Sequence, residues 1–564
     1  MRITLKDLRR AVSAKPQDSI AANSLGLAMV ERGEPLISLD YLRRAIKLAP
    51  QQAEYHCDLA RTLLTLNRHE EAVESYYAAL SLVPMRANVY YELGLLYSKR
   101  PDCQDQSKAF FLRAIELSPG RFADYLELCR MYVKGCSAQE VIACVLNDTK
   151  HIGNMVSIYK AAAISLEEYG RFEEAKECFL KALAINPNEM EILLGLGYVN
   201  VALRDLNAAM KCYKQAYELH SSNLWALSMY FKHLFRVGLH QQAQNLLCSH
   251  EVRDIFRSRN LGLQNKHLDS KPEWDGSSLQ GKAVLVYING GYGDVIHFSR
   301  YATQLKNNGA KVIVQCAKPL HSLIGTLPGV DLVIDIYDEC PPFDYTFQAE
   351  FAAPLIEWCW ESLGRQVPYL FPPPNVRRAW HRKFTGGNDL KVGINWKSST
   401  LASEDHYRFR SLSLEQLRPL TNIPGVKFYS LQVGPGAKEL TSCENPFPAI
   451  DISADFHDFM DTAAAILELD LVITVDTAVA HLAGALGMPC WVMLPYFSCW
   501  RWMLCCTDSP WYQTIKLYRQ AEPGGWSETV SQVAKSLNNL ALSKASAVGS
   551  NIVSLSPYEF VRGA

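Results

Sequence analysis

The sequence predicts a multidomain protein in which an all-α solenoid precedes a pair of Rossmann-like α/β domains. A period near 34 residues runs through the N-terminal half. After about residue 282, the pattern changes to buried strands that alternate with helices. A chain of 564 residues is also too long for one domain.

The composition indicates a folded protein. Hydrophobic residues make up 48% of the chain and charged residues 20%, with a net charge of -1. This balance supports full cores and disfavours a nucleic-acid partner. The first residues, MRITLKDLRR, lack the apolar segment of a secretory signal, and no stretch of roughly 18 apolar residues is free of charge. We therefore expect a cytoplasmic protein with reduced cysteines and no transmembrane segment.

Small and aromatic residues recur at fixed places along the N-terminal half. Across the units, small residues stand where two helices cross, aromatic residues fill the gaps, and proline stops the second helix. The clearest units are Leu25-Gly26, Ala45 and Pro50; Leu59-Ala60, Ala72, Tyr76, Ala79 and Pro84; and Leu93-Gly94, Phe111, Ala114 and Pro119. This spacing resembles that of tetratricopeptide repeats, from about Asp18 to His250.

A tetratricopeptide-like array is expected to form a curved solenoid, because no single repeat buries its apolar face alone. The resemblance implies that its concave groove binds a protein or peptide. The alternatives are self-association into a homo-oligomer or a role as a spacer. We assign residues 1–250 to this solenoid and the polar residues 251–281 to a linker.

Continuous β-rich runs mark two α/β domains, at residues 282–385 and 386–540. A run of this kind suits a parallel strand that is buried on both faces. Strands are predicted at 283–288, 311–315, 332–336, 345–348, 390–396, 427–432, 469–475 and 491–494, and helices at 295–307 and 458–467. Ligands of such domains bind at the carboxyl ends of the strands, in a cleft. The Ser- and Ala-rich residues 541–564 are predicted to form a flexible tail.

The segment from Asp476 to Pro489 is the most informative part of the chain. It follows an apolar strand and opens a helix of small residues. Free backbone amides and the positive end of the helix dipole suit a diphosphate. Thr477 can donate its hydroxyl, and His481 lies one turn further on the same face. The alternative is an ordinary strand–turn–helix unit with Asp476 as its cap.

Several segments of the second half resemble the heptosyltransferase-like glycosyltransferases of GT-B fold, in the branch with N-terminal tetratricopeptide repeats. The segments are Gly290–Tyr301, Val392–Trp396, Tyr407–Leu412, Gly425–Gln432, Asp476–His481, Trp500–Trp502 and Ser509–Tyr512. The resemblance implies that a sugar moves from a nucleotide-sugar donor to an acceptor, by direct displacement with inversion. In this reading the repeats present a protein acceptor.

The resemblance also suggests roles for individual residues. The donor diphosphate would contact Asp476, Thr477, Ala478 and His481, while Asp294 would be the general base. The alternatives are a helix cap for Asp294 and a structural role for His481. Lys397 and Arg410 would offset the charge on the leaving group, with solvated surface charge as the alternative. Further candidate donor contacts are Gly291, Gly293, Trp396, Arg408 and Gln432.

Weaker candidates surround this set. His297 is a second candidate base, and Asp405 and His406 could approach the acceptor from a loop. The aromatic candidates for stacking a base or sugar are Trp396, Trp500, Trp502, Trp511 and Tyr512, for which the core is the alternative. No Asp-x-Asp motif occurs, so we expect no metal and no cofactor beside the donor.

Two rival functions remain open at this stage. One is a heptosyltransferase-type enzyme that acts on a lipid-linked glycan, which a basic or amphipathic membrane-facing stretch would favour. The other is an interaction scaffold whose GT-B half no longer turns over.

Overall fold

A computed structural model gives the arrangement of the chain. It describes residues 5–149, 154–247, 249, 252, 271–288, 290–336, 338–352, 367–384, 387–398, 410–442, 447–496, 498–504 and 506–549. The chain divides into two compact units, Met1–Arg204 and Asp205–Ala564.

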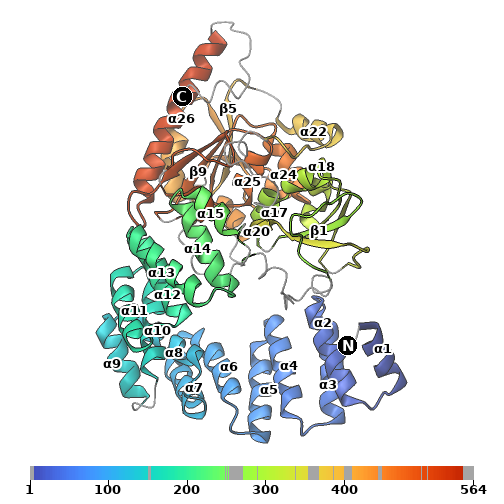
Figure 1. Cartoon of the computed structure of the whole chain (residues 1–564), viewed down its shortest axis with the longest axis vertical. Coiled ribbons are helices and arrows are strands. Elements are labelled where there is room, and N and C mark those ends of the chain that lie inside the picture. Colours follow the sequence, from blue (N-terminus) through green and yellow to red (C-terminus); the bar gives the residue numbers. More distant parts are fainter. Residues whose placement is uncertain are drawn as a thin grey trace. The chain divides into compact units, whose positions relative to one another are not determined.

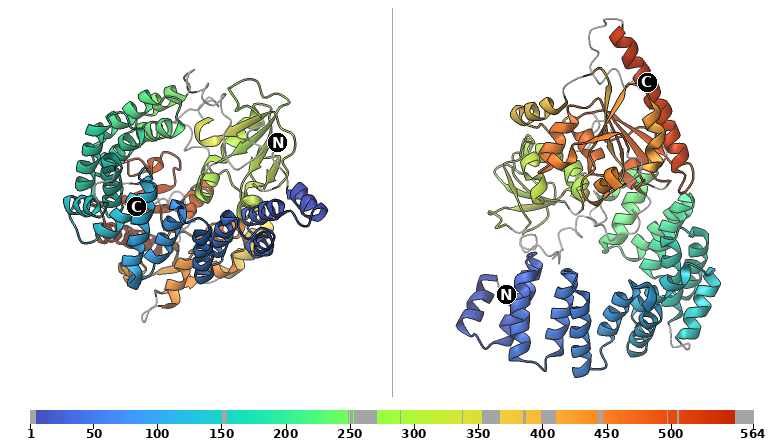
Figure 2. Two further views of the ribbon diagram at one scale, coloured as in Figure 1. Left: turned by 90° about the horizontal axis from the view of Figure 1, so that it is seen from below. Right: turned by 180° about the vertical axis from the view of Figure 1, so that it is seen from behind.

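The first unit consists of helices that follow one another in antiparallel pairs (Figures 1 and 2). They are α1 (Leu5–Ala14), α2 (Ser19–Glu31), α3 (Pro35–Leu48), α4 (Ala53–Thr65), α5 (His69–Leu82), α6 (Ala87–Ser98), η1 (Pro101–Cys103), α7 (Gln104–Leu117), α8 (Phe122–Val133), α9 (Ala138–Asp148), α10 (Met155–Glu168), α11 (Phe172–Ile185) and α12 (Met190–Ala202). The expected helical repeats are therefore confirmed.

Small residues set the distance between paired helices, as the repeat pattern predicts. A Cβ added to Gly26 would lie 2.8 Å from the Leu42 side chain, and one added to Gly94 would lie 2.6 Å from the Phe111 ring. Only glycine permits this approach, so α2 packs on α3 and α6 packs on α7 at close range. Ala45 and Ala79 are fully buried in the same kind of contact.

The second unit begins with α13 (Leu206–Leu219), α14 (Leu224–Arg236) and α15 (His240–Leu247). The expected solenoid ends at residue 250, whereas the boundary between the compact units follows Arg204. The reason is aromatic packing within the second unit. The Phe235 ring of α14 lies 5.4 Å from Trp500 and 6.2 Å from Trp511.

Two parallel sheets form the rest of the second unit (Figure 1). The first has the order β3-β2-β1-β4, and the second has the order β10-β9-β8-β5-β6-β7. Val284 pairs with Val312 in the first sheet, and Val392 pairs with Leu471 in the second. The strands are β1 (Ala283–Tyr287), β2 (Lys311–Gln315), β3 (Leu332–Ile334), β4 (Tyr345–Gln348), β5 (Leu390–Asn395), β6 (Val426–Ser430), β7 (Ala449–Asp451), β8 (Leu471–Val475), β9 (Cys490–Leu494) and β10 (Ile515–Arg519). The predicted fold class is confirmed.

Helices cover both sheets. The helices of the unit are α17 (Tyr292–Phe298), α18 (Tyr301–Asn307), α19 (His321–Ile324), α20 (Ala349–Ala352), α22 (Pro374–His381), α23 (Glu439–Ser442), α24 (Phe459–Ile466), α25 (Ala478–Ala485) and α26 (Trp526–Gly549). Short 3-10 helices are η3 (Lys318–Leu320), η5 (Arg382–Phe384), η7 (Glu415–Asn422), η8 (Pro435–Lys438), η9 (Ser453–Asp455) and η10 (Trp500–Trp502). Among the helices that the structure describes, none has an apolar stretch of the length needed to span a lipid bilayer.

The second sheet separates two hydrophobic cores. Val472 and Val492 face one core, which continues into the first sheet and α14. Ile473 and Met493 face the other, where Val533 of α26 packs. Successive side chains alternate between the faces of a strand, so a strand buried on both sides reads as a continuous apolar run.

Three sequence-based expectations need correction. The helix expected at 295–307 is two helices, because the Arg300 Nε donates to the His297 carbonyl at 2.9 Å and thereby engages a backbone acceptor. The linker expected at 251–281 joins the sheet at its end, where the Trp274 amide donates to the Thr346 carbonyl at 2.8 Å. Most of its earlier residues lie outside the described part.

The expected flexible tail from residue 541 is helical as far as Gly549. Leu540 and Ala541 are buried against the second sheet, and the Lys544 Nζ donates to the Asp470 carboxylate at 2.7 Å. Alanine also favours the helix, so a Ser- and Ala-rich composition here extends α26. Residues 550–564 lie outside the described part.

Candidate anion-binding site

The N-terminus of α25 follows the carboxyl end of β8. Thr477 is the N-cap residue, with an extended backbone (φ -142°, ψ 174°) and no side-chain cap. Its hydroxyl instead donates to the Asn395 Oδ1 at 3.2 Å, at the end of the neighbouring strand β5. The alternative interpretation, in which Asp476 is the cap of this helix, does not hold, because the N-cap residue is Thr477. Without a side-chain cap, the first amides of α25 are suited to an anion.

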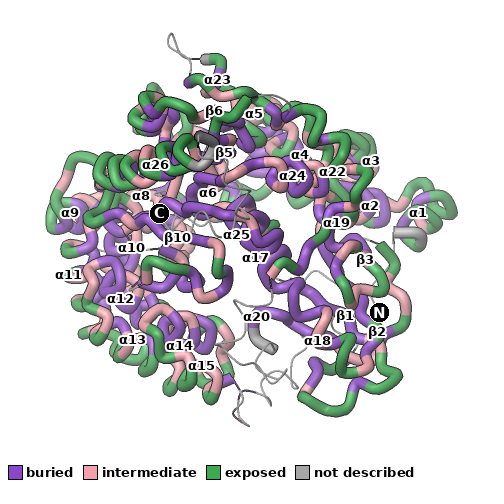
Figure 3. The backbone as a smooth tube through the Cα atoms, turned by 90° about the horizontal axis from the view of Figure 1, so that it is seen from above, coloured by how far each residue is buried: buried purple, intermediate pink, exposed green. Residues whose placement is uncertain are grey.

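Helix α17 of the first sheet packs against α25 of the second, and Figure 3 shows both as buried neighbours. Gly293 makes the contact possible, because a Cβ there would lie 3.3 Å from the Cα of Ala478. The glycine loop and the Asp476–His481 segment, which are about 180 residues apart in sequence, are thus brought together. Gly291 is the N-cap residue of α17.

Tyr512 joins the two helices through their histidines. Its hydroxyl lies 2.9 Å from the Nδ1 of His297 and 3.1 Å from the Nδ1 of His481. Burial holds the pKa of both imidazoles well below the ordinary value, and nearby arginines lower each pKa further. Both histidines are therefore neutral at pH 7.

Three arginines surround His481. In order of their effect on its pKa they are Arg501, Arg300 and Arg410. Arg501 pairs with Asp294, and the Arg410 Nη1 lies 3.9 Å from the Asp476 carboxylate. Three positive and two negative charges leave the group with an excess of one positive charge. An anion at the start of α25 would be attracted by this excess and by the helix dipole.

Asp294 caps the N-terminus of α17, as the alternative interpretation of the sequence predicts. Its Oδ2 accepts a hydrogen bond from the Gly291 amide at 2.9 Å, and its Oδ1 pairs with Arg501. A role as general base is compatible with this geometry, because a carboxylate with these two partners keeps lone pairs that can accept from a hydroxyl. The carboxylate lies at the edge of the group and is about one quarter exposed.

Lys397, Trp396 and Gln432 form a separate cluster. The Lys397 Nζ pairs with Glu439, and the Trp396 Nε1 donates to the same carboxylate at 3.1 Å. Gln432 accepts hydrogen bonds from the Trp396 and Lys397 amides at 3.1 and 2.8 Å. These bonds fix the chain beyond β5. Trp396 is fully buried in the core, so the expected direct donor contact by Trp396 is corrected to a structural role.

Other expectations are corrected by burial. His297 is fully buried and bonded to Tyr512, so an acceptor hydroxyl cannot reach it in this conformation. The other four aromatic candidates for stacking are also core residues, and the Trp502 ring stacks on the His481 ring with centroids 5.1 Å apart. Arg408, Asp405 and His406 lie outside the described residues.

Sequence reasoning missed Arg300 and Arg501 as members of the site. Both lie inside segments that carry the resemblance, and an arginine within a run of aromatic residues was the available signal. Arg300 is buried, donates to the Tyr369 hydroxyl at 3.2 Å and lies 4.7 Å above the Tyr512 ring. Among the residues that the structure describes, no three His, Cys, Asp or Glu side chains form a metal-binding group.

Tetratricopeptide repeat models match residues 61–100, 156–189 and 191–223, so these segments are tetratricopeptide repeats. The Protein FlbA of Caulobacter vibrioides is 25% identical to this chain, over 95% of this chain and 90% of its own length. The human Protein O-mannosyl-transferase TMTC3 is 23% identical over 46% of this chain, and the match covers 27% of TMTC3.

Two solved structures are similar to parts of this chain. A glycosyl transferase family 9 protein from Veillonella parvula covers 47% of this chain and 99% of its own, with 13% identity and a TM-score of 0.35. YrrB, a TPR protein with an unusual peptide-binding site, covers 40% of this chain and 98% of its own, with 14% identity and a TM-score of 0.22.

Proposed function

We propose that the protein is a glycosyltransferase that uses a nucleotide-sugar donor without a metal ion. One observation carries the proposal: an uncapped helix N-terminus lies among three arginines and a neutral histidine, at the carboxyl end of a parallel strand. A diphosphate matches this group in charge. The amides of Ala478 and Val479 would bind its oxygens, as would the guanidinium of Arg410.

The reaction forms one bond and breaks one. The acceptor oxygen attacks the anomeric carbon of the donor, and the bond between that carbon and the phosphate oxygen breaks. The nucleoside diphosphate leaves with the bonding electrons, and fixed amides and arginines offset its growing charge. The acceptor proton passes to a lone pair of the Asp294 carboxylate that neither Gly291 nor Arg501 occupies. Inversion at the anomeric carbon follows from a single displacement.

We propose a protein acceptor, bound by the first unit. Tetratricopeptide repeats bury their small residues between helices, and polar residues remain on the helix faces that are open to a partner. A solenoid of this kind supplies a long surface for an extended chain. The acceptor protein would thereby be held by contacts that are distinct from those of the donor.

A donor screen tests the proposal. The full-length protein is incubated with UDP, GDP, ADP and CMP sugars in the presence of EDTA, and the released nucleotide is measured. We expect hydrolysis of one donor class, and a drop of about 100-fold for Arg410→Gln. Arg418→Gln removes a surface arginine that pairs with Glu415, and it is the matched control. Asp476→Ala should also be impaired, because it removes the carboxylate that lies 3.9 Å from the Arg410 Nη1.

The outcomes separate the rival functions. A donor-dependent mass increase on a co-expressed protein supports a protein acceptor. Transfer only to a lipid-linked glycan would support the heptosyltransferase-type alternative. If no nucleotide sugar is bound or hydrolysed, the second unit is a non-catalytic partner of the repeats.

A further inference from the structure

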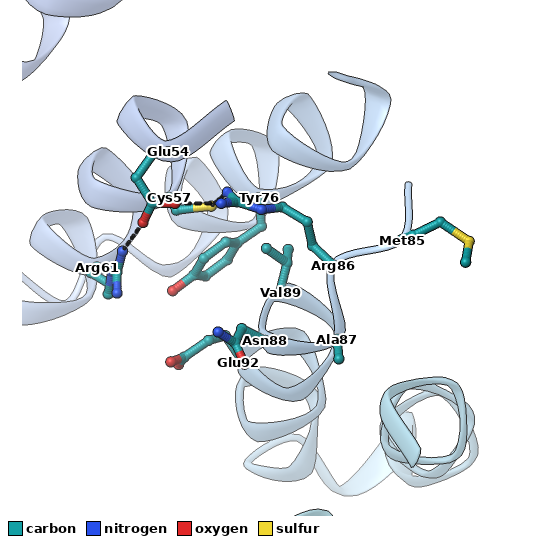
Figure 4. A pocket seen from close by; sticks show the side chains of 10 residues that line it. All are labelled: Glu54, Cys57, Arg61, Tyr76, Met85, Arg86, Ala87, Asn88, Val89 and Glu92. Atoms are coloured by element: carbon teal, nitrogen blue, oxygen red, sulfur yellow. Dashed lines mark hydrogen bonds and ion pairs between the residues drawn. The ribbon is translucent and has the colours of Figure 1, made fainter. Parts of the chain in front are cut away.

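A cavity of about 340 Å³ lies in the first unit, between α4, α5 and α6 (Figure 4). Glu54 and Arg61 of α4 are seven residues apart and therefore lie on one face of that helix. Tyr76 of α5 and Glu92 of α6 line the cavity from the other helices. These residues belong to the repeats and have no part in the donor site.

The arginines of the cavity already have carboxylate partners. The Arg61 Nη2 donates to Glu54 at 3.0 Å and to Asp58 at 2.9 Å, and Arg86 pairs with Glu54 as well. Two arginines and two carboxylates therefore balance. An anionic ligand would have to displace these carboxylates, so the cavity is poorly suited to it.

Glu92 and Tyr76 differ from the arginines. Within the described residues, Glu92 has no ion pair and accepts no hydrogen bond, and burial raises the pKa of its carboxyl. Tyr76 is only 1% exposed, and its buried hydroxyl has no hydrogen-bond partner. Figure 4 shows both polar ends on the side of Arg61. Two acceptors that lack donors thus line the same cavity, and the ionised Glu92 carboxylate adds a negative charge to it.

We propose that this cavity binds the cationic side chain of a lysine or arginine in a protein that docks on the first unit. The cation would donate hydrogen bonds to the Glu92 carboxylate and the Tyr76 hydroxyl, which regain the bonds that burial removed. Its methylene stem would pack on Val89 and on Met85, an apolar side chain that is 70% exposed. That the docked protein is the glycosyl acceptor rests on the proposed function. Its binding at this cavity does not.

Fluorescence anisotropy with the full-length protein tests this inference, in the absence of any nucleotide sugar. The probe is a labelled, end-capped peptide, Ser-Ala-Lys-Ala-Ser, and matched peptides carry norleucine or glutamate at the centre. We expect the lysine peptide to bind about tenfold more tightly than the norleucine peptide, as a charge-assisted pair predicts. Binding should weaken as salt rises.

Matched variants locate the binding. Glu92→Gln keeps the shape of the side chain and should lower the affinity for the lysine peptide about tenfold. Tyr76→Phe should lower that affinity about threefold. Glu74→Gln is the control, since Glu74 is exposed on the neighbouring helix α5. Far-UV circular dichroism verifies that each variant is folded.

Three results would overturn the inference: no saturable binding of the lysine peptide, equal binding of the lysine and norleucine peptides, or preference for the glutamate peptide. Each is independent of the donor screen. A protein that binds the lysine peptide through Glu92 but hydrolyses no nucleotide sugar would retain this site and lose the proposed catalytic function.

Discussion

Gly293 and His481 lie so close that a Cβ on the glycine would be 2.9 Å from the Cδ2 of the histidine. This contact joins the N-terminal turn of α17 to the first turn of α25, and so brings the glycine loop of the first sheet to the helix N-terminus of the second. The absent side chain at residue 293 is thus a condition for assembling the candidate site.

Gly293→Ala should separate these helices. The added methyl group meets both the His481 ring and the Ala478 backbone, and such overpacking costs about 1–3 kcal/mol of unfolding free energy. We expect donor hydrolysis to fall together with stability. Chemical denaturation and the donor screen measure the two effects.

Gly291→Ala is the matched control for this substitution. A Cβ at Gly291 would meet no atom within 4 Å, and the backbone φ of -80° suits alanine. Its stability should remain within about 0.5 kcal/mol of the parent. Equal behaviour of the two alanine variants would contradict the close contact of α17 and α25.

The Tyr512 hydroxyl connects two neutral histidines, and Tyr512→Phe should show its contribution. One hydroxyl has a single proton, so it donates to one imidazole and accepts from the other. Its removal leaves two buried ring nitrogens without partners and should cost about 2 kcal/mol of unfolding free energy. Tyr301→Phe is the control, because the buried Tyr301 hydroxyl has no hydrogen-bond partner. A Tyr301→Phe loss as large as that of Tyr512→Phe would refute this assignment.

Asp124 gives the first unit a predictable response to pH. It is fully buried, neither carboxylate oxygen accepts a hydrogen bond, and burial raises its pKa from 3.8 to about 6. Between these values the folded chain keeps a proton that the unfolded chain has released. The contribution of Asp124 to stability is therefore present below about pH 4 and is lost as the pH rises through 6.

Asp124→Asn removes this buried charge. We expect the variant to be more stable than the parent by about 1–3 kcal/mol near pH 8, and equal to it near pH 4. Far-UV circular dichroism is the suitable probe, because all tryptophans lie beyond residue 204. Asp105→Asn, at an exposed site in α7, should show no such pH dependence. Destabilisation of Asp124→Asn near pH 8 would show that the charge is compensated.

Phe235 tests whether α14 is part of the second unit. Truncation to alanine removes a buried ring that packs on Trp500 and Trp511, and should cost about 3 kcal/mol or more. Trp225→Ala, at a half-exposed position of the same helix, should change stability by much less. Tryptophan fluorescence during denaturation measures the stability of both variants.

Fragments of the chain test the same boundary. A fragment of residues 205–549 should fold, and a fragment of residues 251–549 should not.

Local sequence patterns predicted the strands well because each signal is contained in a few residues. The run Leu469–Val475 is apolar apart from Asp470 and Thr474, and β8 occupies Leu471–Val475. The break between α17 and α18 was not predictable in this way. It depends on the Arg300 side chain, which bonds the His297 carbonyl and also reaches Trp511 and Tyr369 from distant parts of the chain.

The candidate site was only partly predictable for the same reason. The Asp476–His481 segment and the residues before it predict a strand that is followed by a helix N-terminus, and the structure has both. The pair between Asp294 and Arg501 joins residues 207 positions apart, and no local pattern encodes it. Trp396 shows the opposite error, since an aromatic residue at the end of a strand can be either a ligand platform or core.

A crystal structure of the protein with the nucleoside diphosphate selected by the donor screen, grown with EDTA, would locate the bound diphosphate. We expect its density within hydrogen-bond distance of the Ala478 and Val479 amides and of the Arg410 guanidinium. A nucleotide bound elsewhere on the chain, or a diphosphate with no contact to the first turn of α25, would contradict it.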